Sequence, residues 1–348
     1  MTSAVIENTE RRRKSTRVVL LTAILLFLLL LCGVLYTLWS TINLPEHKPV
    51  LSQQPGVVVE FQALSGSFGL VDHPLGVAYD RTNDKIYATE PIAGKVLVFD
   101  GNGKNGRLFV QDESRQATQT PLSGTSVKSP EGIDVGADGS VYIADPDKNA
   151  VVVFTPEGRK VREIAFAKPT RVTVVGDRLY VLLSPGTLVV TDLRGNVVNR
   201  FGTRGGAAQN LYGPTGVAVD AKRNSYITDS ENFRLVALSA ALKPIWQNGQ
   251  PGSSDASMSA RSLQLPTGIT LGADGNLYVV DGMAGQILVF NRSGNVIAPP
   301  LSSNGSADNQ LHLPQTIYWM KDDLFVIADQ YHNRVVGFRL TPQPLQPK

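Results

Sequence analysis

Five acidic residues recur at equivalent places in the sequence, each at the end of a short apolar run. They are Glu90, Asp145, Asp229, Asp281 and Asp329. A ring of carboxylates could hold a hard cation such as calcium, because such ions take several oxygen ligands. A residue that recurs once per repeat is better explained as fixing its own turn by accepting backbone hydrogen bonds. We therefore expect these five carboxyl groups to stabilise the fold.

A second recurring set follows the prolines of six segments that read Pro-x-Gly or a close variant. Its members are Leu75, Glu131, Thr170, Thr215, Thr267 and Gln315, and Arg171 replaces the glycine of the third segment. If the segments begin the inner strands of a ring, these side chains meet at the mouth of a central channel. The mouth then forms a shallow polar binding site centred on Glu131, with Arg171 nearby. The alternative is that the polar side chains only solvate six strand ends.

The elements that position both sets are short apolar runs divided by polar turns. Leu265 to Val296 is the clearest copy, with runs GITL, LYVV and QILVF, turns at Asp274-Gly275 and Ser293-Gly294, and a fourth run at Asn295 to Ala298. Such runs are typical of an antiparallel meander. The six prolines, Pro74, Pro130, Pro169, Pro214, Pro266 and Pro314, lie 56, 39, 45, 52 and 48 residues apart. One sheet of this size is not stable alone, so the pattern predicts an all-β, six-bladed β-propeller over residues 57–340.

The two ends of this region predict how the ring closes. Val57 to Phe61 forms a strand before the first repeat, and the last repeat stops after its third strand, Arg334 to Leu340. We expect the N-terminal strand to become the fourth strand of the last blade. Residues 43–56, which contain three prolines, form a linker, and residues 341–348 form a C-terminal tail.

One face of the propeller should carry the long connections between blades. The Pro-x-Gly ends, the acidic ends and the long connections Gln111–Lys128, Gly249–Ser262 and Ser302–Gln310 all open on it. We call it the loop-bearing face and expect function there, because loops held by a rigid scaffold carry many binding sites. The third blade departs from the pattern at Arg171 and at Leu183, which replaces the recurring acid. That blade is either a specialised pocket or a degenerate copy.

The N-terminal part of the chain predicts a membrane anchor. Residues 1–17 form a stub with a basic cluster, and Val18 to Trp39 follow as 22 uncharged residues. A helix of that length is roughly 33 Å long, enough to cross a bilayer. We therefore predict a transmembrane signal-anchor helix over 18–42, with the basic stub in the cytoplasm and the propeller outside. A cleavable signal peptide would be shorter in its apolar part and carry a small-residue cleavage site, and the only cysteine, Cys32, lacks the small preceding residues of a lipoprotein signal.

The repeats resemble a known family. Pro-x-Gly before an apolar strand, Tyr142-Ile143-Ala144-Asp145, Tyr278-Val279-Val280-Asp281 and Asn333-Arg334-Val335 before a Phe resemble the NHL repeat. The resemblance covers about Val57 to Leu340 and implies a six-bladed propeller closed by an N-terminal strand. It is weak for function, because NHL propellers serve RNA binding, protein interaction, ligand sensing and lyase chemistry.

Histidines decide whether a metal-dependent activity fits. The NHL family that the repeats resemble includes an amidating lyase with histidine-bound zinc. A zinc site of that kind needs about three close histidines. The candidates are His73, His312 and His332, of which the first two become neighbours when the ring closes. They are the alternative metal ligands, with zinc or calcium as the metal; otherwise we expect no cofactor. No nucleophile elbow, His-Glu-x-x-His or phosphate loop is found in the sequence.

Charge argues against the RNA-binding role found in the family. Of 33 Lys and Arg residues five lie in 1–42, and of 30 Asp and Glu residues two do, so residues 43–348 carry 28 of each. Nucleic-acid binders generally present a concentrated positive surface. We therefore expect a membrane-anchored, extracytoplasmic binding or scaffolding module whose partner is a protein, a peptide or an envelope glycan. The alternative is a metal-dependent lyase or hydrolase similar to the amidating branch of the family.

Overall fold

The computed structural model describes residues 57–67, 69–111, 127–205, 210–249 and 263–341. The chain divides after Val50 into two units, and every described residue belongs to the second, Leu51–Lys348. No helix among the described residues is long and apolar enough to cross a membrane. The predicted anchor over 18–42, the stub, the linker and nearly all of the tail lie outside them.

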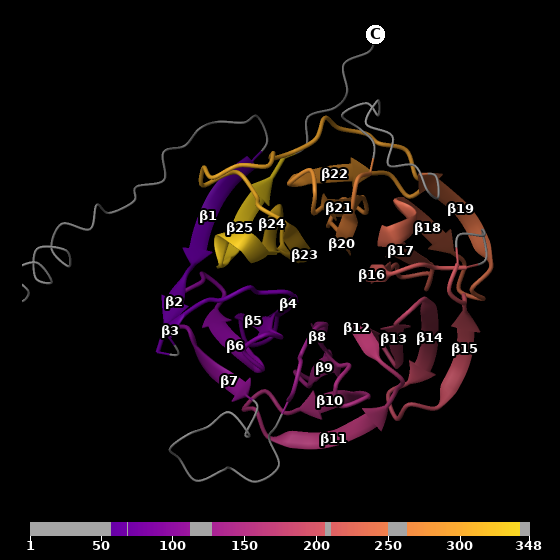
Figure 1. Ribbon diagram of the computed structural model, residues 1–348, viewed down its shortest axis with the longest axis horizontal. Coiled ribbons are helices and arrows are strands. Elements are labelled where there is room, and N and C mark those ends of the chain that lie inside the picture. Colours follow the sequence, from indigo (N-terminus) through magenta and orange to yellow (C-terminus); the bar gives the residue numbers. More distant parts are fainter. Residues whose placement is uncertain (1–56, 68, 112–126, 206–209, 250–262, 342–348) are drawn as a thin grey trace, which may run out of the picture. The chain divides into compact units, whose positions relative to one another are not determined.

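Six antiparallel sheets form a ring in which each sheet presents one strand to the central axis (Figure 1). The inner strands are β4 (Val77–Asp80), β8 (Ile133–Val135), β12 (Pro169–Val175), β16 (Pro214–Val219), β20 (Pro266–Leu271) and β23 (Pro314–Lys321). The second strands are β5 (Lys85–Glu90), β9 (Val141–Asp145), β13 (Arg178–Leu183), β17 (Ser225–Asp229), β21 (Leu277–Asp281) and β24 (Leu324–Asp329). The six-bladed propeller predicted from the repeats is therefore confirmed.

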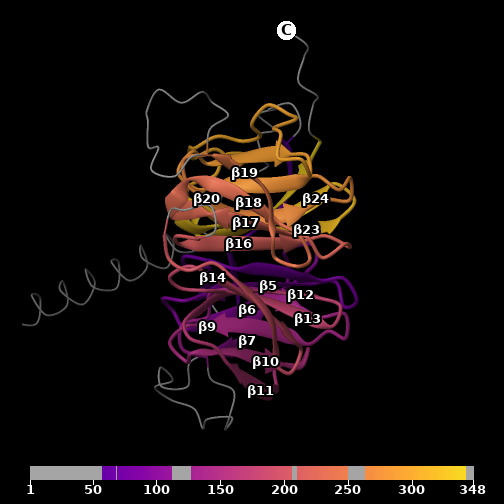
Figure 2. The same ribbon diagram turned by 90° about the vertical axis from the view of Figure 1, so that its right-hand side faces the viewer.

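The outer half of each blade is less regular. The third strands are β6 (Lys95–Asp100), β10 (Ala150–Phe154), β14 (Thr187–Asp192), β18 (Arg234–Leu238), β22 (Gln286–Phe290) and β25 (Arg334–Leu340). The fourth strands are β7 (Arg107–Gln111), β11 (Lys160–Ala165), β15 (Val197–Phe201), β19 (Pro244–Gly249) and, in blade six, β1 (Val57–Ala63). A small hairpin of β2 (Ser65–Gly66) and β3 (Gly69–Leu70) follows β1, and single 3-10 turns η2 (Ser230–Asn232) and η3 (Gln330–His332) follow β17 and β24. Figure 2 shows blade four from the side, with β16 to β19 in successive layers outward from the axis.

Blade five lacks the fourth strand that we expected at Asn295 to Ala298. Only isolated bridges, Phe290 to Val296 and Ile287 to Leu301, occupy that edge. The residues between the two bridges include Pro299 and Pro300. Proline has no backbone N–H to donate to a ladder, so the edge cannot pair continuously.

The N-terminal strand closes the ring as predicted. β1 pairs antiparallel with β25, from Val57 opposite Leu340 to Ala63 opposite Val335, so the ends of the propeller share blade six. The Phe61 ring lies against two glycines, Gly337 of blade six and Gly103 of blade one, where a Cβ would come within 2.2 and 2.4 Å of its carbon atoms. Arg339 forms an ion pair with Glu60, which adds a contact between β25 and β1.

The core consists of six apolar clusters, each between two neighbouring blades. The second and third strands are covered on both faces; all five residues of β9, for example, are buried. Phe109 of blade one stacks edge-on with Tyr87 at 4.9 Å and with Phe154 of blade two at 6.1 Å between ring centroids. Each blade therefore depends on its neighbours for burial, as radial repeats require.

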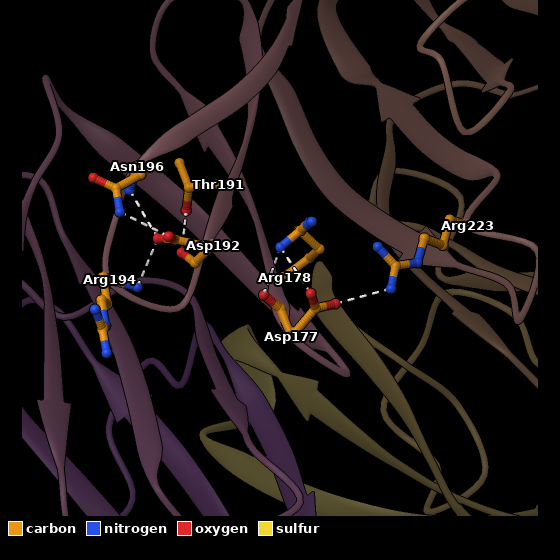
Figure 3. Close-up of polar contacts among 7 residues, drawn as sticks. All are labelled: Asp177, Arg178, Thr191, Asp192, Arg194, Asn196 and Arg223. Carbon is orange, nitrogen blue, oxygen red and sulfur yellow. Dashed lines mark hydrogen bonds and ion pairs between the residues drawn. The ribbon is translucent and has the colours of Figure 1, made fainter.

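On the face opposite the loop-bearing face, short polar turns follow the first and the third strands of the blades. Figure 3 shows two of them in blade three. The Asp192 carboxylate accepts hydrogen bonds from the backbone N–H groups of Arg194 and Asn196, both at 2.9 Å, which fixes the turn after β14. In the turn between β12 and β13, Asp177 forms ion pairs at 2.8 Å with Arg178 and with Arg223 of blade four.

Candidate functional site

The five recurring acids have the structural role that we expected. All are fully buried. Each accepts a hydrogen bond from a backbone N–H two residues before the proline of its own blade, at 2.5 to 2.9 Å; the donors are Asp72, Lys128, Tyr212, Gln264 and His312. The carboxylates thus hold the start of each inner strand against the end of the second strand. Arg334 pairs with Asp329 at 2.7 Å, and Arg234 pairs with Asp229 in the same way.

The residues predicted to ring the channel mouth line a single pocket of about 300 Å³ on the loop-bearing face. All seven, Leu75, Glu131, Thr170, Arg171, Thr215, Thr267 and Gln315, are among its lining residues. The pocket also includes Ser184, Ser230, Glu231, Leu265 and Leu313, which we did not single out. Ser184, Ser230 and Glu231 follow the recurring acidic position by one or two residues, so the same repeat pattern contained the signal for them.

Several of the mouth hydroxyl groups are used to join blades. Thr215 donates to the carbonyl oxygen of Thr267 at 2.8 Å, and Thr267 donates to that of Pro314 at 2.8 Å. Thr316 reaches the carbonyl oxygen of Leu75 at 2.7 Å. These bonds run from one blade to the next around the channel. The threonines therefore contribute stability first and pocket polarity second.

Arg171 lies between the mouth and the channel behind it, because it lines both cavities. Its Nε donates to the carbonyl oxygen of Thr215 in blade four at 2.5 Å, which is the inter-blade bond that threonines make elsewhere. Its Nη1 is buried and has no hydrogen-bond partner among the described residues. Burial lowers the pKa of Arg171, and the charge of Glu131 opposes that shift. Burial likewise raises the pKa of Glu131, which the charge of Arg171 opposes.

A larger cavity of about 470 Å³ occupies the channel from Arg171 to the opposite face. Asp134 is buried in its wall, with its Oδ2 bonded to the Val174 N–H of blade three at 2.7 Å and its Oδ1 to the Tyr318 hydroxyl of blade six at 2.9 Å. Burial raises the pKa of Asp134 to about 6. This pair was not predicted from the sequence, although Asp134 and Tyr318 occupy a position of the inner strands that carries Ala or Thr in the other blades.

Trp319 and Arg81 lie at the open end of this larger cavity. The guanidinium carbon of Arg81 is 4.4 Å from the centroid of the Trp319 ring, and its Nη2 donates to the Trp319 carbonyl oxygen at 2.9 Å. Arg292 also lines this end and donates from Nε to the carbonyl oxygen of Gly275 at 2.9 Å.

The three candidate metal ligands gather where blades six and one meet, around the exposed ring of Tyr331. The Tyr331 centroid lies 5.9 Å from that of His73 and 5.2 Å from that of His312, and the centroids of His312 and His332 are 5.6 Å apart. Two of the rings are held by carboxylates, His73 by Asp72 at 2.5 Å and His332 by Asp329 at 2.7 Å. Within the described residues, no group of three or more His, Cys, Asp or Glu side chains is close enough to hold a metal ion.

The long connections can be placed only in part. Most of the segments at Gln111–Lys128 and Gly249–Ser262 lies outside the described residues. The Ser302–Gln310 connection does lie on the loop-bearing face, because the Asn304 N–H donates to the carbonyl oxygen of Ala284 at 3.1 Å, three residues after the recurring Asp281.

Comparison with known proteins agrees with this geometry. The family model of the SMP-30/Gluconolactonase/LRE-like region, abbreviated SGL, matches residues 64–184. Human NHL repeat-containing protein 2 is 24% identical over 108 residues, which cover 30% of this chain and 15% of the relative. The chain is an SGL/NHL-like six-bladed propeller.

Other similarities extend over most of this SGL/NHL-like propeller. The protein SUPPRESSOR OF QUENCHING 1, chloroplastic, from Arabidopsis thaliana is 24% identical over 308 residues, which are 77% of this chain but 26% of that protein. The chain thus spans about a quarter of that relative's length. A streptogramin B lyase structure has a TM-score of 0.55 at 15% identity and covers 82% of this chain and 98% of the lyase. A gluconolactonase from Xanthomonas campestris has a TM-score of 0.58 at 11% identity, covering 82% and 89%. At these identities the two structures share the fold only.

Proposed function

We propose that this chain is a binding or scaffolding module that takes up its ligand at the channel mouth of the loop-bearing face. The observation that supports this most strongly is the single pocket of about 300 Å³ to which all six blades contribute a residue. It combines a guanidinium, carboxyl groups, hydroxyl groups and leucines in one concave surface, which is the mixture expected of a ligand site. The ligand is a protein segment, a peptide or an envelope glycan.

The proposed setting is the outer side of a membrane. The uncharged run within Val18–Ile42 and the basic stub before it support an uncleaved anchor with the propeller outside the cytoplasm. A module held in this way acts on ligands close to the membrane surface. The equal numbers of basic and acidic residues in 43–348 speak against nucleic acid as the partner.

A mouth-filling variant tests the binding site. Gln315→Trp places an indole in the mouth, where the Gln315 side chain makes only two hydrogen bonds, to Leu313 and Gln330. Val198→Trp adds the same group on the exposed outer strand β15 and is the matched control. In a thermal-shift screen of the detergent-solubilised full chain against peptides and oligosaccharides, we expect at least one class to stabilise the wild type and the control but not Gln315→Trp. A hit that stabilises Gln315→Trp equally would place binding elsewhere.

The metal-dependent alternative is tested by elemental mass spectrometry of the same purified chain, prepared without chelator. The observation that favours it is the close approach of His312 and His332, with ring centroids 5.6 Å apart. One zinc or calcium ion per chain that is lost in His312→Ala would favour a lyase or hydrolase. Metal that is absent, or retained by that variant, would favour the binding module.

A further inference from the structure

Arg171 is the residue at which the third blade leaves the repeat, and its surroundings explain where its side chain must go. At the equivalent place in blades one, two, four and five stands a glycine, Gly76, Gly132, Gly216 or Gly268. A Cβ on Gly132 would lie 2.6 Å from the Cα of Arg171 itself, so the two inner strands are in close contact there. The long side chain therefore extends into the channel, where it lines both cavities.

The Arg171 guanidinium is held in place by one hydrogen bond, but part of its capacity to donate hydrogen bonds is unused among the described residues. Nε is committed to the carbonyl oxygen of Thr215 at 2.5 Å, which fixes the plane of the group. Nη1 is buried without a hydrogen-bond partner among the described residues. A buried donor without a partner costs free energy, and a charged one costs more. Because Arg171 lines the mouth pocket, this donor points to an acceptor that arrives from outside.

The chemistry of that acceptor follows from the shape of the Arg171 guanidinium and from the charged side chains that line the same pocket. An arginine fork matches a planar pair of oxygens, as in a carboxylate. Glu131 and Glu231 line the same pocket, so a doubly charged phosphate would meet two carboxylates around one guanidinium. A singly charged carboxylate with a neighbouring N–H donor would instead satisfy both Arg171 and Glu131.

We propose that Arg171 receives the carboxylate of an α-amino acid or of a peptide carboxyl terminus, with the adjacent nitrogen donating to Glu131. This inference rests on the proposed function, since it assigns the ligand of the same mouth pocket. Thr170 and Leu75 also line the pocket and would contact the rest of the ligand. A pocket of about 300 Å³ suits one or two residues of such a ligand.

The test compares two libraries of N-acetylated tetrapeptides that differ only at their last group, a free carboxylate or an amide, together with a mixture of free amino acids. Binding to the detergent-solubilised full chain is measured by ligand-observed NMR and by calorimetry. We expect the free-carboxylate library or the amino acids to bind about tenfold or more tightly than the amides, which is the usual worth of a charge-assisted hydrogen bond. Preference for the peptides would indicate a chain end as the ligand, and preference for the amino acids a free metabolite.

Variants locate the effect. Arg171→Gln should lose the preference for carboxylate, while Arg194→Gln removes an exposed arginine in the turn after β14, which is drawn in Figure 3, and should keep it. Equal binding of acids and amides to the wild type would overturn the inference even if Arg171→Gln does not fold. If that binding is lost in Gln315→Trp, the mouth still binds ligands and only the carboxylate assignment fails. Failure of every library to bind, or tighter binding of inorganic phosphate that depends on Arg171, would also overturn it.

Discussion

Asp134 places a carboxyl group at a position of the inner strands where four other blades carry Ala or Thr. Its carboxyl group is buried, and burial raises its pKa from 3.8 to about 6 although three hydrogen bonds oppose this. The folded state therefore binds this proton more tightly than the unfolded state does. Asp134 contributes most to stability below about pH 4, and that contribution is lost as the pH rises to about 6.

We predict that Asp134→Asn changes the pH dependence of stability. The amide of the variant does not titrate. Its free energy of unfolding should therefore rise relative to that of the wild type between pH 4 and pH 7, by at most about 3 kcal/mol. Chemical denaturation at several pH values measures the difference. Asp220 in the same cavity is the control. Burial raises the pKa of Asp220, but hydrogen bonds from Asn224 and Tyr226 outweigh burial and lower it below its ordinary value of 3.8. Asp220→Asn should therefore run parallel to the wild type between pH 4 and pH 7 and show the opposite slope only below about pH 4. Parallel curves for Asp134→Asn and the wild type would contradict the prediction.

Asp229 shows what one recurring acid contributes. It receives hydrogen bonds from the Tyr212 N–H, from Asn232 and from the fully buried Arg234. We predict that Asp229→Ala costs about 3–5 kcal/mol, because it leaves a buried cation without its counter-charge. Asp177→Ala removes a carboxylate with two exposed ion pairs and should cost less than about 1 kcal/mol. Urea denaturation compares the two; similar losses would mean that the acids do not hold the blade ends.

At the scale of elements, the contact between β1 and β25 decides whether the ring closes. Gly337 of β25 lies beneath the Phe61 ring of β1, and a Cβ there would come within 2.2 Å of the ring. We predict that Gly337→Ala lowers the free energy of unfolding by about 1–3 kcal/mol, since inserting a methyl group into a tight contact forces strands apart. Thermal or urea denaturation measures the loss.

A double-mutant cycle identifies the cause of that loss. In a Phe61→Ala background the methyl group has room, so Gly337→Ala should then cost little. The same loss in both backgrounds would mean that glycine is needed at this place for a reason other than the Phe61 ring.

At the scale of the whole molecule, the proposed anchor governs where the propeller works. We predict that N-terminal sequencing of membrane-extracted protein finds residues before Val18, because the apolar run is too long for a cleaved signal peptide. Washing membranes at high pH should leave the chain in the pellet. A mature N-terminus near Thr41, or release by washing, would contradict an uncleaved anchor.

The repeats explain why so much of the fold could be predicted. Most blades repeat the same local features, such as the proline that starts the inner strand and the acid at the place of Asp281, and the number of copies makes the pattern visible. The prediction of a fourth strand in blade five was wrong. It rested on the apolar run at Asn295 and did not take account of the two prolines that follow this run. The mouth residues could be listed for a similar reason, since one strand start per blade must face the axis of a closed ring.

What the sequence by itself determined follows from its repeats: the number of blades, the need for a closing strand and the one residue that each blade places at the mouth. Tertiary structure alone decided how unique residues meet across the ring. Tyr318 reaches Asp134 in blade two, and Arg171 bonds to blade four while its buried Nη1 has no partner in the part of the chain that the structure describes. Such contacts join residues as far as 184 positions apart in the chain and depend on the width of the channel. Local patterns cannot encode that width, because it arises only when all six blades pack against one another.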